Sequence, residues 1–144
     1  MVEERTFRWS EEPVPELGAD GEILVRNLVL SLDPTQRGWI ARDTYLPAVK
    51  LGEVMRSGAA GRVVKSRSPG YAEGDLVMGM FGWQDYAVVK TDGKSAPTKV
   101  LPGVPLELAM STLGLTGITA LTAALSQKST PDTAPPPGPW SNVP

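Results

Sequence analysis

The two side chains that most often carry enzyme chemistry, histidine and cysteine, are both absent from this chain. Zinc sites are built mainly from imidazole and thiolate ligands, so the composition argues against a bound metal. A serine–histidine–aspartate or cysteine–histidine nucleophile cannot be assembled either. Any general acid or base must therefore come from Asp, Glu, Lys or Tyr side chains.

Glycine spacing gives one candidate for phosphate binding, the GAAG segment at 58–61. A dinucleotide-binding turn leads from a strand into a helix whose N-terminus receives the pyrophosphate, and an acidic residue further along holds a ribose. Residues 58–61 are followed neither by an amphipathic helix nor by an acidic residue at a suitable distance. We therefore interpret the segment as part of a strand and expect no phosphate loop in this sequence.

Composition limits the classes of partner. The 144 residues, 41% hydrophobic and 21% charged, suit a domain of ordinary size with its own core. A net charge of −2 without a basic stripe predicts binding to neither nucleic acid nor an anionic membrane. The first residues lack the apolar core of a signal peptide, so a cytoplasmic location is the default expectation.

The elements that would position any chemistry are expected to be strands. The sequence predicts four of them, over residues 22–32, 58–66, 75–81 and 83–90. The first alternates apolar and polar residues, is expected to be buried on both faces at its end, and precedes a helical turn at 35–40. The last two are expected to form a hairpin about Gly82, and Ser68-Pro69-Gly70 to form a turn. Short strands with frequent turns predict a mainly β fold, a barrel or a sandwich.

The chain changes character after residue 104. Residues 105–127 carry Glu107 and then no charge until Lys128, and their apolar residues recur near helical spacing. Hydroxyl groups and glycines interrupt this run, which is only marginally long enough to cross a membrane. A buried helix leading into a second domain fits better. Residues 128–144 are too rich in proline for a helix or a central strand, and predict a disordered or polyproline-like tail.

Several segments occur together in the order found in one protein family. They are EEPVPEL, GEILVRNLVLSLDPTQRGWI, YLPAVKLGEVMRSGAAGRVVKSRSPGYAEGDLV, GWQDYAVV and LGLTGITALTAAL. Residues 7–125 thus resemble the zinc-independent medium-chain dehydrogenase/reductase proteins, in the branch of prostaglandin reductase, leukotriene dehydrogenase and alkenal and curcumin reductases. The lack of Cys and His agrees with the zinc-free branch.

The resemblance implies a GroES-like, partly open β-barrel with short helices over residues 1–104. A C-terminal helix, at about 105–126 within the segment 105–127, would lead toward a Rossmann domain. Residues 128–144 would form the proline-rich tail. The Rossmann domain itself is not expected within this sequence.

Family members reduce the C=C bond of α,β-unsaturated carbonyls by hydride transfer from NADPH. The resemblance therefore implies a truncated oxidoreductase that is inactive alone and does not bind NADPH tightly. The alternative is a non-enzymatic β-barrel binding module, with the APPPGP run docking on a partner. An exposed helix over 105–127 could also drive self-association.

Site residues also follow from the resemblance, and none is assigned a catalytic role. The candidates for the substrate pocket are Thr35, Arg37, Tyr45 and Met55. The candidates for cofactor binding are Met55, Arg56, Gly117 and Thr119. Thr35 stands where the family commonly has a pocket tyrosine, which weakens tyrosine-assisted carbonyl binding. Arg37 could instead pair with Asp33, and for Tyr45, Trp83 and Tyr86 packing is favoured over substrate contact.

Overall fold

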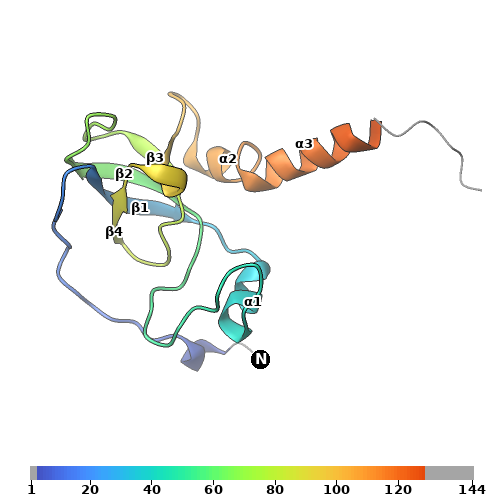
Figure 1. The fold of residues 1–144 in the computed structure, drawn as a ribbon, viewed down its shortest axis with the longest axis horizontal. Coiled ribbons are helices and arrows are strands. Elements are labelled where there is room, and N and C mark those ends of the chain that lie inside the picture. Colours follow the sequence, from blue (N-terminus) through green and yellow to red (C-terminus); the bar gives the residue numbers. More distant parts are fainter. Residues whose placement is uncertain (1–2, 129–144) are drawn as a thin grey trace, which may run out of the picture.

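The computed structural model describes residues 3–128, and its main feature is one open antiparallel sheet (Figure 1). The strands are β1 (Glu22–Leu30), β2 (Ala59–Ser66), β3 (Leu76–Gly79), β4 (Tyr86–Lys90) and β5 (Thr98–Lys99). They lie in the order β4-β1-β2-β3-β5, so the two edge strands β4 and β5 do not pair with each other. This confirms the predicted mainly β, partly open barrel. Residues 129–144, most of the predicted proline-rich tail, lie outside the described residues.

Helices are short apart from the last one. They are α1 (Thr35–Ala41), α2 (Leu106–Met110) and α3 (Leu115–Lys128), with 3-10 turns at Glu4–Thr6 and Gly93–Ser95. The helical turn predicted at 35–40 is thus confirmed as α1. The turn at 68–70 is also confirmed, because the Tyr71 N–H donates to the Ser68 carbonyl oxygen at 3.2 Å.

The core lies between the inner faces of the central strands. Its buried members come from every strand except β5 and from the segment after β3: Ile23, Val25, Ala59, Val63, Val77, Phe81 and Ala87. Alternating residues of β1 point inward, as its period of two predicts. The prediction that β1 is buried on both faces at its end was wrong, because Leu28, Leu30 and Leu32 are exposed. The register shifts after Asn27, and β4 pairs with β1 only as far as Arg26, so this end of β1 lacks one neighbour.

The predicted hairpin about Gly82 was also wrong. β3 pairs with β2 and β5, whereas β4 pairs with β1 on the other side of the sheet. The connection over residues 80–85 therefore crosses the barrel instead of turning back on itself. Phe81 explains the difference, since its ring is buried in the core and anchors the crossing segment there.

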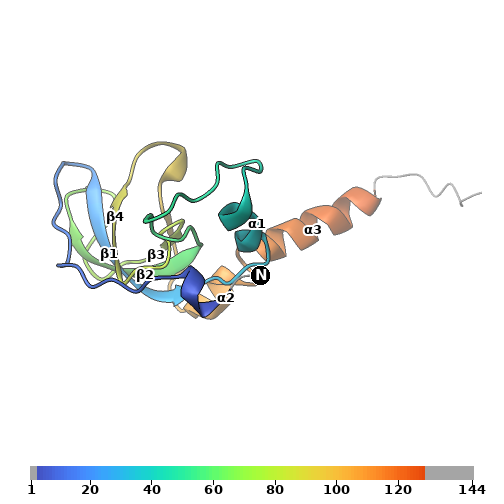
Figure 2. The same cartoon turned by 90° about the horizontal axis from the view of Figure 1, so that it is seen from below.

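The predicted C-terminal helix is divided in two at residues 111–114. A Cβ atom on Gly114 would lie 2.6 Å from the Met110 carbonyl oxygen, so the chain turns there in a way that needs glycine. α2 packs on β2, with the Met110 methyl group close to Gly58, whereas α3 extends away from the sheet in both views (Figures 1 and 2). The described part of the chain has no helix that is both long and apolar enough to span a bilayer.

Candidate functional site

The carbonyl oxygen of Ser31 joins three segments at one end of the sheet. It accepts a hydrogen bond from the Gln36 side-chain amide at 2.9 Å and from the Ser57 hydroxyl at 2.6 Å. Both donor side chains are buried, and the hydrogen bonds avoid the free-energy cost of burying an unpaired polar group. The end of β1, helix α1 and the segment 52–58 are thereby fixed relative to one another.

The segment 52–58 also pairs with the chain that crosses the barrel. The Met55 carbonyl oxygen accepts from the Trp83 N–H at 2.9 Å, and the Ser57 carbonyl oxygen accepts from the Gly82 N–H at 3.0 Å. Gly82 has a φ of +76°, a conformation that favours glycine, and a Cβ there would lie 2.8 Å from a Val54 methyl group. The Met55 side chain is buried. Residues 52–58 together with Gly82 and Trp83 are called the Met55 wall below.

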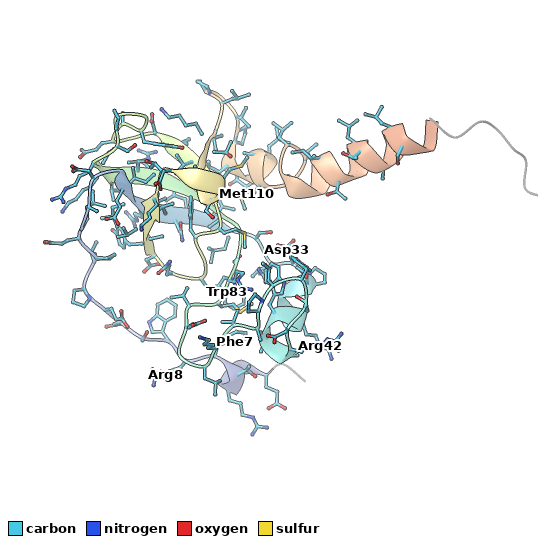
Figure 3. The ribbon with its side chains drawn as sticks, in the orientation of Figure 1. Phe7, Arg8, Asp33, Arg42, Trp83 and Met110 are labelled. Carbon is cyan, nitrogen blue, oxygen red and sulfur yellow. The ribbon has the colours of Figure 1, made fainter. Side chains whose placement is uncertain are left out.

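Aromatic rings flank the Met55 segment. The Trp39 ring meets the Tyr45 ring edge-on with centroids 6.3 Å apart, and the Arg56 guanidinium lies over Trp39. On the other side Trp83 packs against Phe7 from the N-terminal segment, with ring centroids 5.0 Å apart (Figure 3). The Met55 segment thus has aromatic ring pairs on both sides.

Three buried side-chain atoms near this wall have no hydrogen-bond partner among the described residues. They are the indole nitrogens of Trp39 and Trp83 and the side-chain oxygen of Asn27. The amide group of Asn27 is engaged, since it donates to the Gln84 carbonyl oxygen at 2.8 Å. A buried hydrogen-bond donor without an acceptor lowers the stability of the fold. Unpaired donors such as the two indole N–H groups could be satisfied by an acceptor on a bound ligand.

The structure brings some of the predicted site residues together. Arg56 and Tyr45 both contact the Trp39 ring, and Met55 precedes Arg56 in the same segment. The Arg56 guanidinium has a second partner, because it also donates a hydrogen bond to the Pro47 carbonyl oxygen at 3.1 Å. Thr35 begins α1, and its side chain is exposed.

The other predicted site residues lie apart from this group. Arg37 is exposed on the outward face of α1. It makes no ion pair with Asp33 among the described residues; that carboxylate instead accepts from the Ser31 hydroxyl at 2.7 Å. Gly117 and Thr119 belong to α3, which extends away from the sheet (Figures 1 and 2). Their predicted role in cofactor binding stays a prediction.

Sequence reasoning missed several residues that organise the site, notably Gln36, Trp39 and Ser57. Gln36 and Trp39 are three positions apart and are the two buried residues of α1, so a helical-face analysis of residues 35–41 could have found them. Ser57 gave no signal, because a small polar residue before a glycine is typical of a loop. Its complete burial is decided by segments distant in sequence.

Comparison with known proteins gives the family. Residues 1–96 match the family described as the N-terminal domain of oxidoreductase. The chain belongs to the zinc-independent medium-chain dehydrogenase/reductase family, through its N-terminal domain. The "NADPH-dependent curcumin reductase" of Escherichia coli is 44% identical to this family member over 87 residues, which cover 60% of this chain and 25% of that protein. A "2-alkenal reductase (NADP(+)-dependent)" of Nicotiana tabacum is 32% identical over 114 residues, covering 74% and 31% of the two chains.

Solved structures agree with the family assignment. CurA from Vibrio vulnificus superposes with a TM-score of 0.71 at 32% identity, over 81% of this chain and 34% of that one. The structure of CurA with NADPH gives a TM-score of 0.66 at 34% identity, over 83% and 34%. The chain thus spans about a quarter to a third of the length of the relatives that it matches. The GroES-like fold and the family's dependence on NADPH, both predicted, are confirmed.

Strand packing accounts for the glycine-rich segment that is the candidate for a phosphate loop. The GAAG segment lies in β2, as predicted, apart from Gly58, which immediately precedes it. Gly61 faces β1 so closely that a Cβ would lie 2.7 Å from a Val25 methyl group, which accounts for the glycine through strand packing. Residues 3–128 also contain no group of three or more Asp or Glu side chains placed to hold a metal ion.

Proposed function

We propose that this chain forms the barrel-side wall of the substrate cleft in an NADPH-dependent reductase of α,β-unsaturated carbonyls. The observation that carries the proposal is the agreement in fold and sequence with CurA in complex with NADPH, over 83% of this chain. The names of the curcumin and alkenal reductases indicate the same substrate class. Cytoplasmic location, and the absence of nucleic-acid and membrane partners, remain predictions.

In such a reaction NADPH supplies a hydride to the β-carbon of the enone, and the α-carbon takes a proton. The residues of this chain contribute to positioning. Met55, whose carbonyl oxygen accepts from the Trp83 N–H, would border the face where the nicotinamide and the enone meet. Arg56 is already engaged with Trp39 and Pro47, so we assign it to holding this wall rather than to binding a phosphate.

The proposal also assigns separate roles to two parts of the chain. We propose that the barrel occupies residues 1–104, and that the segment 105–127 connects it to a nucleotide-binding domain. The 144 residues alone would then show no turnover and no tight NADPH binding. Gly117 and Thr119 would meet the cofactor only when a nucleotide-binding domain covers α3.

A chimera tests both parts. Residues 1–128 would be joined to the C-terminal part of the E. coli curcumin reductase, and NADPH oxidation would be followed with a simple alkenal. We expect turnover by the chimera and only background by the 144-residue chain. A folded chimera that binds NADPH but reduces no enone would reject the substrate class. Turnover by the 144-residue chain would reject the claim that it needs a nucleotide-binding domain for activity.

A further inference from the structure

The outward face of α1 bears a pocket that the proposed reductase wall does not use. It has a volume of about 400 Å³ and is lined by Pro34, Arg37, Gly38, Ala41 and Arg42. Ala41 lies four residues after Arg37 and three after Gly38 within α1, whereas Pro34 and Arg42 cap its two ends. Trp39, by contrast, faces the interior. The pocket and the Met55 wall thus lie on different sides of α1.

Two arginines give this pocket its charge. Arg37 and Arg42 are both exposed, and among the side chains that the structure describes neither guanidinium makes an ion pair or a hydrogen bond. The acidic residues next to them in sequence are engaged elsewhere. Asp33 accepts from Ser31, and Asp43 accepts from the Ala48 N–H at 2.8 Å. Among the described residues neither carboxylate forms an ion pair with the two arginines of the pocket (Arg42 is labelled in Figure 3).

Two of the residues that line the pocket with the arginines are small. Gly38 has no side chain, and a Cβ there would meet only Thr44, at an ordinary contact distance of 3.7 Å. Ala41 adds a single methyl group. A ligand group of a few heavy atoms can therefore approach the helix surface at Gly38 and Ala41.

We propose that this pocket binds the oxyanion of a small ligand, a phosphate or a carboxylate group, through Arg37 and Arg42. The planar guanidinium fork matches the paired oxygens of both groups, and two such forks can share one anion. The phosphate would come from a nucleotide and the carboxylate from an acidic substrate. This binding claim does not rest on the proposed reductase function, because isolated oxyanions can test it.

The experiment titrates the 144-residue chain with inorganic phosphate and, separately, with acetate. Side-chain Nε–H resonances of the arginines are followed by NMR at low ionic strength, where exposed charges are least screened. We expect saturable shifts confined to Arg37 and Arg42, with affinity falling as salt is raised toward about 0.15 M. Tighter binding of phosphate would assign a nucleotide source, and tighter binding of acetate a carboxylate source.

Two variants and one matched control decide the assignment. Arg42→Gln removes one fork and should weaken binding at least about tenfold, the scale of a charge-assisted hydrogen bond. Ala41→Glu keeps both arginines but places a carboxylate between them, and should also abolish saturation. Arg62→Gln changes an exposed arginine on β2 and should bind like the parent chain. Non-saturating shifts in the parent, or an equal loss in Arg62→Gln, would overturn the proposal. Dispersed amide resonances in each variant confirm folding.

Discussion

The guanidinium carbon of Arg56 lies 5.6 Å from the centre of the Trp39 ring, and the same side chain donates to the Pro47 carbonyl oxygen at 3.1 Å. One residue therefore links the Met55 segment, helix α1 and the loop between them. Tyr45 belongs to that loop and packs edge-on against the same Trp39 ring. The Arg56 side chain thus adds a cation–π contact and a hydrogen bond to the backbone and side-chain hydrogen bonds that hold the Met55 segment.

Replacing Arg56 with Met should lower the free energy of unfolding by about 1–2 kcal/mol. A partly exposed cation–π contact and one hydrogen bond each contribute on the order of 1 kcal/mol. Denaturant unfolding followed by tryptophan fluorescence measures the change. Arg62→Met, on an exposed position of β2, is the control and should change stability by no more than about 0.5 kcal/mol. Equal effects of the two substitutions would contradict a specific role for Arg56.

Gly82→Ala should destabilise the fold more than the same change at another glycine of positive φ. At Gly82 the added methyl group would lie 2.8 Å from Val54 and 3.0 Å from the Met55 carbonyl oxygen. Gly103 has a φ of +81° with no atom within 4 Å of a Cβ, so Gly103→Ala isolates the backbone strain. We expect about 1 kcal/mol for the control and a further 1–3 kcal/mol, roughly, at Gly82. Thermal unfolding compares them, and similar losses would reject the close approach of Gly82 to the Met55 segment.

Asp75 should make stability depend on acid pH. The Lys99 ammonium, whose nitrogen lies 2.7 Å from its carboxylate, lowers the pKa of Asp75 below its usual 3.8, and the Ala72 N–H adds to this while partial burial opposes it. Since the folded-state pKa lies below the unfolded one, the stabilisation is fully present above pH 3.8. It is lost as pH falls through the lowered pKa.

Asp75→Asn measures this contribution. The loss of unfolding free energy caused by the substitution should be larger at about pH 7 than at about pH 3, and smaller at high salt. Denaturant unfolding at each pH provides the comparison. A loss that is independent of pH would show that the carboxylate charge does not stabilise the fold.

The apolar face of α3 should promote association of the 144-residue chain. Ile118, Leu121 and Leu125 follow helical spacing and are 58%, 61% and 58% exposed. Burial of each leucine is worth about 1.5–3 kcal/mol, so Leu121→Gln with Leu125→Gln should raise the concentration needed for self-association more than tenfold, roughly. Sedimentation or light scattering measures the mass. Ala123→Gln, two positions from Leu121 and on another side of the helix, is the control and should leave association unchanged.

Local patterns predicted the elements whose signals are contained within a few residues. The strand β1, the break at Asp33-Pro34 and the helical turn after it are all present in the structure. The path of β4 could not be predicted in this way, because two short strands separated by a glycine look like a hairpin whichever neighbours they pair with. The burial of Phe81, which depends on the whole core, decided the outcome.

The candidate site was predictable only in part. The family's sequence pattern pointed to Met55, Arg56 and Tyr45, and the structure places Arg56 and Tyr45 against the Trp39 ring. It gave no account of Ser57 or Gln36, because their role comes from sharing the Ser31 carbonyl oxygen. That sharing brings together residues up to 26 positions apart in sequence, which no local period reveals.

The pairing of β1 with β4 has a consequence for how the chain is made. Leu24 is opposite Val88, so this edge of β1 has no partner strand until more than sixty further residues have been synthesised. An uncovered strand edge is a template for pairing with another chain. Newly made copies therefore pass through a vulnerable interval that ends only when Lys90 has emerged, and slower translation across that stretch should increase aggregation during synthesis.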